Sequence, residues 1–300
     1  MPLPVVSHPL YDAGFPPGHR FPMSKYRLLR EELVARGLIG TGSDFEPEPP
    51  GFALLARAHE PGYVRQVLGY AVDPKIEREI GFPVTERVSL RAQLATGGTV
   101  MAARLALAHG LACNAAGGSH HARRSHGAGF CTFNDVAVAA LRLLDEGAVK
   151  SVLVVDLDVH QGDGTADILA SEPRVFTLSV HAEKNYPVRK VPSSLDVGLP
   201  DGVEDEAYLS MLRGLLPRLI AERPFDLVFF NAGVDPHRDD KLGRLALSDE
   251  GLRAREETVI GFFRERGIPL CGVIGGGYGA DVEAVARRHA ILFETAARFA

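Results

Sequence analysis

The chain has 300 residues, of which 46% are hydrophobic and 24% are charged, and its formal net charge is −5. This composition is ordinary for a globular protein, and the length suits one α/β domain. The acidic balance argues against a surface for nucleic acid or anionic membranes, and no uncharged apolar run reaches the roughly 18 residues that a membrane helix needs. We therefore expect a single domain over residues 1–300 with no nucleic-acid and no membrane partner; the composition gives no oligomeric state.

The cysteines and the first residues bear on the compartment. Cys113, Cys131 and Cys271 are odd in number and far apart, which suits a reducing compartment better than a disulfide framework. The first residues lack a basic flank followed by an apolar run, so no secretory signal is expected. These features predict a cytoplasmic protein, and any metal would be held by residues other than cysteine.

Strands and helices are expected to alternate along the chain. Apolar runs and longer amphipathic segments predict, in chain order, helix 86–108, helix 134–146, strand 151–156, strand 174–180, helix 205–222, strand 227–231, helix 248–266, strand 269–274 and helix 281–297. Asn134 and Ser248 suit helix N-caps, and the proline-rich stretch 41–51 is typical of a loop. This alternation predicts a parallel sheet covered on both faces, whose ligand binds beyond the carboxyl ends of the strands.

Polar side chains follow the strand predicted over 151–156. If the backbone stays extended there, Asp156, Asp158 and His160 point to one side, and Leu157 and Val159 point to the other. Two carboxylates buried together are costly without a cation, so this spacing predicts a metal site. The alternative interpretation is a helix-capping aspartate beside a hydrogen-bonded core histidine.

The strand predicted over 227–231 also leads to a carboxylate, Asp235. Together with an aspartate and a histidine from the first motif, it would complete an oxygen and nitrogen ligand set. Such a set, with positions left open, suits a hydrolytic Zn²⁺ or Fe²⁺ ion. Asp235 can also simply begin the turn before Pro236.

Two further motifs carry groups for proton transfer and oxyanion binding. His120 and His121 follow a Gly-Gly loop, and a histidine can take a proton from water and pass it to a leaving amine. Tyr278 follows three glycines, and its phenol can donate a hydrogen bond to an oxyanion. A surface histidine pair and a glycine-rich turn with a packed tyrosine are the alternatives. Combined with the metal, these groups would suffice for metal-assisted amide hydrolysis.

The motifs, in this order, resemble those of the histone deacetylase family. They are Gly-Gly-Ser-His-His-Ala (117–122), Gly-Phe-Cys-Thr-Phe-Asn-Asp (129–135), Asp-Leu-Asp-Val-His-Gln-Gly-Asp-Gly-Thr (156–165), Asn-Ala-Gly-Val-Asp (231–235) and Gly-Gly-Gly-Tyr (275–278). The compact chain and segment 18–26 resemble the small bacterial and class IV-like members, including acetoin-utilization deacetylases. The resemblance covers most of the chain and implies a single-domain arginase/deacetylase fold, with an eight-stranded parallel β-sheet between helical layers.

The resemblance also implies a role for each candidate. The implied ligands of Zn²⁺, with Fe²⁺ as the alternative, are Asp158, His160 and Asp235. The implied catalytic residues are His120, His121, Tyr278, Asp156 and Asp163. In this scheme His121 is the general base and pairs with Asp163, whereas His120 tunes the charge and pairs with Asp156. Tyr278 would polarise the substrate carbonyl.

A second ion and a substrate tunnel follow from the same resemblance. The implied ligands of a structural K⁺, through side chains or backbone, are Asp156, Asp158, His160, Ser179 and Val180. The implied tunnel residues are Gly129, Phe130, Tyr186, Pro187, Leu242, Gly276 and Gly277. Leu242 is apolar where acetylpolyamine-selective relatives carry a glutamate, which argues against a cationic polyamine substrate.

The implied activity is that of a zinc-dependent hydrolase that removes acetyl or other acyl groups from lysine side chains of a peptide or protein. It would use metal-activated water, a histidine base and a tyrosine that stabilises the oxyanion. An amidohydrolase of small acetylated metabolites or acetylpolyamines is the alternative. A silent acyl-binding module is disfavoured because every candidate residue is present.

Overall fold

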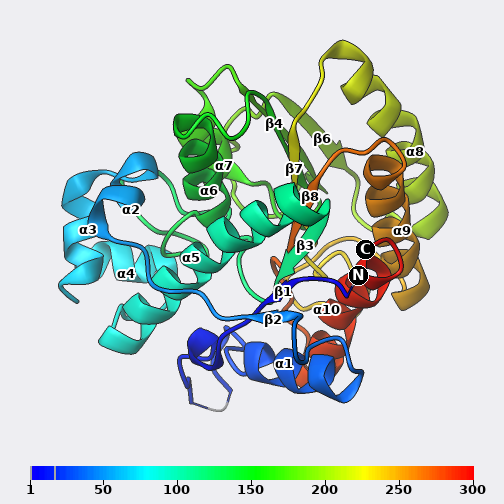
Figure 1. Cartoon of the computed structure of the whole chain (residues 1–300). Coiled ribbons are helices and arrows are strands. Elements are labelled where there is room, and N and C mark those ends of the chain that lie inside the picture. Colours follow the sequence, from blue (N-terminus) through cyan, green and yellow to red (C-terminus); the bar gives the residue numbers. More distant parts are fainter. Residues whose placement is uncertain (1, 17) are drawn as a thin grey trace.

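The computed structural model describes residues 2–16 and 18–300, so Met1 and Pro17 lie outside it. Within these residues, one sheet has the strand order β2-β1-β3-β8-β7-β4-β5-β6, and all neighbouring strands are parallel (Figure 1). The strands are β1 (Val5–Val6), β2 (Asp44–Phe45), β3 (Leu111–Asn114), β4 (Val152–Asp156), β5 (Val175–Ala182), β6 (Leu195–Leu199), β7 (Leu227–Asn231) and β8 (Leu270–Val273). The expected α/β class and eight-stranded parallel sheet are confirmed.

Helices connect the strands and cover both faces of the sheet. They are α1 (Lys25–Ala35), α2 (Phe52–Ala58), α3 (Pro61–Leu68), α4 (Pro74–Ile80), α5 (Glu86–His109), α6 (Asp135–Asp145), α7 (Asp163–Leu169), α8 (Asp205–Glu222), α9 (Asp249–Arg264) and α10 (Val282–Ala297), with a short 3₁₀ turn at Pro9–Tyr11. Helices α5 and α6 pack together, and on the other side α1 packs on α10, α10 on α9 and α9 on α8. In the described ranges, no helix combines the length and the hydropathy that crossing a bilayer requires.

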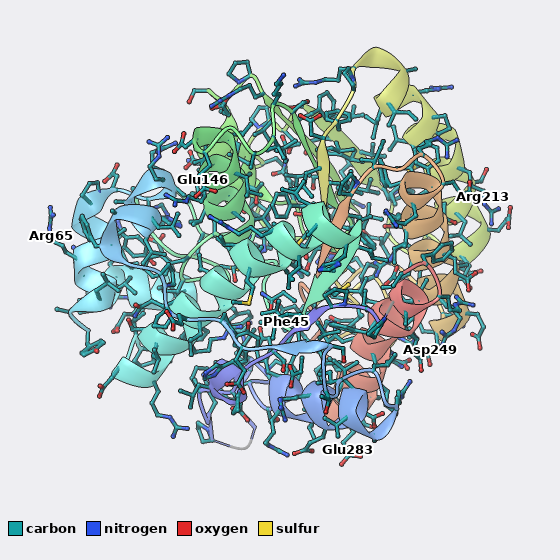
Figure 2. All side chains as sticks on the ribbon, viewed as in Figure 1. Phe45, Arg65, Glu146, Arg213, Asp249 and Glu283 are labelled. Atoms are coloured by element: carbon teal, nitrogen blue, oxygen red, sulfur yellow. The ribbon has the colours of Figure 1, made fainter. Side chains whose placement is uncertain are left out.

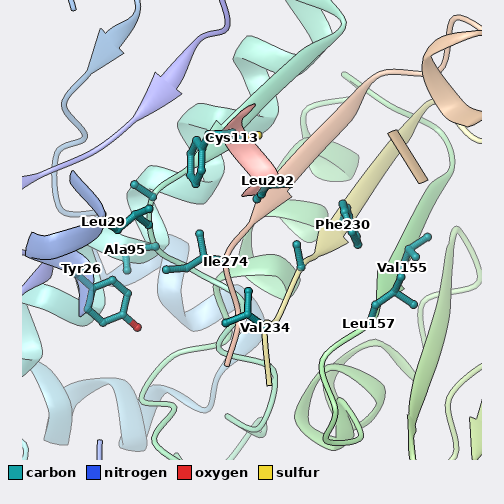
Figure 3. Close-up of a cluster of buried hydrophobic side chains, with 14 of the residues drawn as sticks. Tyr26, Leu29, Ala95, Cys113, Val155, Leu157, Phe230, Val234, Ile274 and Leu292 are labelled. Atoms are coloured by element: carbon teal, nitrogen blue, oxygen red, sulfur yellow. The ribbon is translucent and has the colours of Figure 1, made fainter. Parts of the chain in front are cut away.

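Alternate residues of the central strands pack into two separate apolar cores, one on each face of the sheet. Val154 and Phe229 belong to the core under α5 and α6, whereas Val155 and Phe230 belong to the core under α8, α9 and α10. Figure 2 shows charged side chains projecting from the outer helices, and Figure 3 shows Val155 and Phe230 among the buried side chains of the second core. Burial on both faces explains why these strands are continuously apolar in sequence.

The predicted elements match the structure closely. All four predicted strands and all five predicted helices are confirmed to within two residues at each end. Both predicted N-caps are confirmed, since Asn134 accepts a hydrogen bond from the N–H of Ala137 and Ser248 accepts one from Gly251. The prediction of an unbroken loop over 41–51 is wrong, because Asp44 and Phe45 form β2 beside β1.

Candidate metal centre and catalytic site

The candidate residues gather beyond the carboxyl ends of three central strands. Asp156 ends β4, Asn231 ends β7 and Val273 ends β8, and the strand register places these three residues side by side. The loops that follow these strands therefore begin side by side at the same edge of the sheet. This is the edge at which parallel sheets bind their ligands.

Asp158, His160 and Asp235 form one tight group in this region. All three are buried, and each offers a ligand atom within 4.8 Å of the other two. His160 Nδ1 lies 3.1 Å from Asp158 Oδ1 and 3.1 Å from Asp235 Oδ2. Two carboxylates and one imidazole form a donor set that suits a divalent metal ion such as Zn²⁺.

Backbone N–H groups hold the remaining carboxylate oxygens. Asp158 Oδ2 accepts a hydrogen bond from Gly276 N at 2.7 Å, and Asp235 Oδ1 accepts one from Val159 N at 2.9 Å. A Cβ atom at Gly276 would overlap Asp235 Oδ2, so the backbone can approach only as glycine. The glycine run before the tyrosine thus orients Asp158, and the backbone of Val159 orients Asp235.

The electrostatics of this group also fit a cation. Burial and the neighbouring Asp158 carboxylate raise the pKa of Asp235 to about 7. Two carboxylates in one buried site repel each other, and that repulsion disfavours the second negative charge. A divalent cation held by Asp158, His160 and Asp235 relieves the repulsion. Geometry, donor chemistry and charge therefore all indicate a divalent cation at this group.

Asp156 lies outside this group, contrary to the expectation of an extended run. Strand β4 ends at Asp156 and the backbone bends over residues 158–160, so the assumption of an extended chain is wrong. Asp156 Oδ2 lies 2.7 Å from His120 Nδ1, and Asp156 Oδ1 accepts a hydrogen bond from Asn231 Nδ2 at 2.9 Å. Asp156 thus supports a histidine rather than joining the three clustered side chains.

The adjacent histidines are buried, so the alternative of a surface pair is wrong. His120 Nε2 faces Asp158 Oδ1 at 3.6 Å, and the His121 ring lies 5.7 Å from the His160 ring. His121 Nδ1 lies 2.6 Å from Asp163 Oδ1. Each histidine therefore stands between a carboxylate and the Asp158, His160 and Asp235 group.

The pKa values of the two histidines shift in opposite directions, because His120 faces two carboxylates, whereas His121 faces Asp163 alone. Arg123 donates to Asp163 Oδ2 from Nε at 3.0 Å and from a terminal nitrogen at 2.6 Å, which offsets the charge of Asp163. Burial, together with the nearby His120, lowers the pKa of His121 to about 4. Burial also acts to lower the pKa of His120, but Asp156 and Asp158 outweigh it and raise that pKa to about 9.

A cavity of about 420 Å³ reaches His121, His160 and Tyr278 from the surface. Four of the expected tunnel residues line it: Gly129, Phe130, Tyr186 and Leu242. The other three do not: Pro187 is buried after a cis peptide bond, Gly277 packs against Val234, and Gly276 lines a smaller inner cavity of about 20 Å³. The sequence therefore indicated one wall and the mouth of the cavity better than its inner end.

Tyr278 lines both the outer cavity and the inner one, as does Phe130. Its ring centroid lies 5.6 Å from Phe130 and 6.1 Å from His160. Its backbone N–H donates to Asp240 Oδ2 at 2.6 Å. Burial, with Asp158 and Asp235 nearby, raises the pKa of Tyr278 well above its usual value. The phenol therefore keeps its proton at neutral pH.

Buried cations that the sequence did not indicate support the loops. Lys25 donates to the carbonyl of Gly275 at 3.1 Å, ahead of the tyrosine. Arg255 donates to the carbonyls of Gly233 at 2.7 Å and Leu157 at 3.2 Å, next to the two clustered aspartates. Arg255 stands in an Arg-Glu-Glu run that is typical of an exposed helix face, so no pattern in the sequence distinguishes it.

Comparisons with known proteins agree with this geometry. The model of the histone deacetylase domain matches residues 19–295. The chain is 45% identical to an uncharacterized protein of Picosynechococcus sp., over 99% of each chain, and 32% identical to histone deacetylase 2 of Arabidopsis thaliana, over 87% of this chain and 70% of that one. A crystal structure of an HDAC homolog complexed with SAHA matches with a TM-score of 0.84 and 25% identity, over 99% of this chain and 84% of the other. The chain therefore belongs to the histone deacetylase family, and it is a hydrolase of that family with a buried Asp-His-Asp group that suits a divalent metal ion.

Proposed function

We propose that the protein removes acetyl groups from lysine side chains of a peptide or protein, with Zn²⁺ held by Asp158, His160 and Asp235. The observation that carries this proposal is the convergence of His121, His160 and Tyr278 on the outer cavity, with Asp158 on the inner cavity and Asp235 grouped with Asp158 and His160. When bound, Zn²⁺, or Fe²⁺ as the alternative, would polarise the amide carbonyl and lower the pKa of water.

We assign proton abstraction from the attacking water to His121. Its Nδ1–H donates to Asp163, which leaves Nε2 free to accept a proton. The low pKa of His121 keeps its ring neutral at pH 7, whereas the raised pKa of His120 keeps that ring protonated. His121 can then pass the proton to the leaving amine, while the positive charge of His120 stabilises the negative charge that develops beside it.

Tyr278 is assigned to the oxyanion. Its phenol stays protonated, so it can donate a hydrogen bond to the carbonyl oxygen as negative charge develops there. The contacts of its ring with Phe130 and the hydrogen bond of its backbone to Asp240 fix the position of the hydroxyl group. Such preorganisation removes the cost of reorienting a donor during the reaction.

The inner cavity favours a short acyl group. It is lined by Asp158, His120 and Tyr278 among others, and its volume of about 20 Å³ has room for about one water-sized group. An acetyl methyl group fits that space, whereas a long acyl chain requires the wall to move. Acetyl is therefore the proposed acyl group.

Two further expectations stay within the proposal. A structural K⁺ beside β4 is supported by the register that sets Asp156 opposite Ser179; backbone carbonyls of Asp158, His160 and Val180 would complete its ligands. Membership of the small bacterial and class IV-like group, which includes acetoin-utilization deacetylases, rests on the compact chain and on segment 18–26.

The test compares the wild type with Asp235→Ala. We expect one metal ion per wild-type chain by mass spectrometry and hydrolysis of an acetyl-lysine peptide that SAHA inhibits. Asp235→Ala should lose the metal and at least about 10³-fold in rate, because the metal site loses a ligand. Asp145→Ala, which removes an exposed aspartate that pairs with Arg57, is the matched control. It should retain the bound metal and the wild-type rate.

Two outcomes would contradict the proposal. Bound metal without turnover of acetyl-lysine or long-acyl-lysine peptides would instead favour a small acetylated metabolite as substrate. If wild-type protein binds no metal even after zinc is added back, the assignment of Asp158, His160 and Asp235 as ligands is wrong.

A further inference from the structure

The mouth of the cavity carries a marked excess of positive charge. A second cavity, of about 620 Å³, adjoins the first, and the two share Arg20, Leu242 and Tyr278. The lysines and arginines that line the pair are Arg20, Arg27, Arg78, Lys184, Lys241 and Arg244. Among the described residues lining either cavity, Glu79 is the one acidic residue. This excess is local, because the whole chain has a net charge of −5.

Among the described residues, four of these cations have no acidic partner. Arg27 pairs with Glu31 at 2.7 Å and Arg244 pairs with Asp201 at 3.0 Å. In the part of the chain that the structure describes, no carboxylate oxygen lies within 4.0 Å of a charged nitrogen of the other four, which are all exposed: Arg20, Arg78, Lys184 and Lys241. We call these four residues the cationic mouth.

The cationic mouth is assembled by the fold. Arg20 precedes α1, Arg78 lies in α4, Lys184 follows β5 and Lys241 lies between β7 and α9. Four segments far apart in sequence thus each bring to the two adjoining cavities one cation that has no acidic partner among the described residues. Two acidic residues of these segments are already engaged: Glu79 faces His126 at 3.3 Å, and Asp240 accepts backbone N–H groups from the loops around it.

We propose that the cationic mouth selects acetyl-lysines that lie in an acidic peptide segment. This inference rests on the proposed function and adds the substrate class. The four cations lie at exposed positions, whereas the walls nearer the metal group are formed by Phe130, Tyr186 and Leu242. The carboxylates that they attract therefore belong to residues flanking the acetyl-lysine and not to the end of the acyl group.

Size and charge both favour a peptide over a polyamine. Together the adjoining cavities leave room for residues on either side of the acetyl-lysine. A cationic polyamine would be repelled by all four side chains. Clefts lined by one sign of charge concentrate ligands of the opposite sign and raise their association rate by about 10-fold to 10³-fold.

The test uses acetyl-lysine peptides of equal length whose flanks carry three Asp residues, three Ser residues or three Lys residues. At low salt we expect kcat/KM for the acidic peptide to exceed that for the neutral one by about tenfold, mostly through KM. The basic peptide should be the poorest substrate. In roughly 0.5 M salt the preference should fall below about twofold, because the charges are exposed to solvent.

A charge-reversal variant tests whether the cationic mouth, and not the rest of the surface, causes the preference for acidic peptides. Arg78→Glu combined with Lys184→Glu should reverse the order of the acidic and basic peptides. Arg213→Glu, on α8 at the periphery (Figure 2), is the matched control and should keep the wild-type order. A succinyl-lysine peptide with neutral flanks tests whether a carboxylate on the acyl group is recognised instead.

The outcomes are distinguishable. Equal kcat/KM for acidic and neutral flanks at low salt overturns the inference, as does a preference for succinyl-lysine that is independent of the flanks. Binding of the same peptides, measured by fluorescence anisotropy, gives an answer even without turnover. Tighter binding of acidic peptides without hydrolysis would support the role of the cationic mouth. It would contradict only the proposed deacetylase function.

Discussion

The floor of the cavity and its mouth carry opposite charges in opposite environments. At the floor, Asp158 and Asp235 are buried, and their charge is balanced by His160, by backbone N–H groups and by the metal that the site suits. At the mouth, the unpaired cations are exposed to water, which stabilises them without protein partners. An uncompensated buried charge is expensive and an exposed one is not. Changes at the floor should therefore have large effects, and changes at the mouth should have small effects that depend on salt.

After Asp235→Ala, the largest expected effect concerns Tyr278, which lines both cavities. Tyr278→Phe removes the hydroxyl group and keeps the ring packed on Phe130, so we expect kcat to fall about 10²-fold to 10³-fold with no loss of metal. Steady-state kinetics together with metal analysis would measure this. Tyr186→Phe is the matched control, because its ring contacts His121 at the exposed wall, and it should change the rate little. If Tyr278→Phe leaves the rate unchanged, the assignment of Tyr278 as the oxyanion donor is wrong.

A buried histidine behind the floor should make the protein sensitive to acid. His59 Nε2 accepts the N–H of Asn134 at 2.9 Å, and Nδ1 donates to the carbonyl of Arg123 at 2.8 Å, so the ring links two segments beside the catalytic histidines. Burial lowers its pKa to about 4. Since the unfolded chain binds this proton near pH 6.5, the contribution of His59 to stability is complete above that pH and is lost as the pH falls towards 4.

Linkage predicts that His59 alone lowers the free energy of unfolding by about 2 kcal/mol between neutral pH and pH 5. Urea unfolding at both pH values measures the difference. His59→Gln should lower stability at neutral pH and flatten the pH dependence, whereas His109→Gln, at the exposed end of α5, should leave it as in the wild type. If His59→Gln keeps the full pH dependence, other groups account for the acid sensitivity.

The floor could be predicted from the sequence because its residues follow apolar strands at fixed spacings. Asp158, His160 and Asp235 stand within four residues of the ends of β4 and β7, and parallel strands bring such ends together. Residue spacing alone misplaces Asp156, because the backbone bends over residues 158–160. The resemblance pairs Asp156 with His120, and Asp156 Oδ2 lies 2.7 Å from His120 Nδ1. Strands β1, β2, β3 and β6 were not predicted; β1 and β2 have two residues each, which is too few for any periodic pattern.

The mouth could not be predicted for a different reason. Arg20, Arg78, Lys184 and Lys241 are ordinary exposed cations, and no motif in the sequence gives them a shared location, although Arg20 lies in segment 18–26. Their shared location depends on four loops and helices that meet only in the folded chain. Lys25 and Arg255 illustrate the reverse case, since both are charged residues in helices that the fold buries completely against backbone carbonyls. Local sequence therefore reveals chemistry at strand ends better than charge gathered from distant segments.

The smallest effect predicted here tests the mouth at one position. Leu242 lines both cavities, and its carbonyl accepts a hydrogen bond from Asn185 Nδ2 at 2.6 Å, which holds the loop while the side chain is changed. Leu242→Glu adds a carboxylate where acetylpolyamine-selective relatives carry one. The preference for acidic over neutral flanks should fall by about twofold to fivefold, since an exposed ion pair contributes about 0.2–1 kcal/mol.

Leu242→Gln is the matched control, because it has nearly the shape of the glutamate without its charge. If both variants change the preference equally, the shape of the mouth matters and its charge does not. If the glutamate variant alone weakens the preference, and the weakening disappears in roughly 0.5 M salt, the effect is electrostatic. A modest, salt-sensitive change would mean that selectivity at the mouth is spread over several weak charges, whereas activity at the floor depends on each buried group individually.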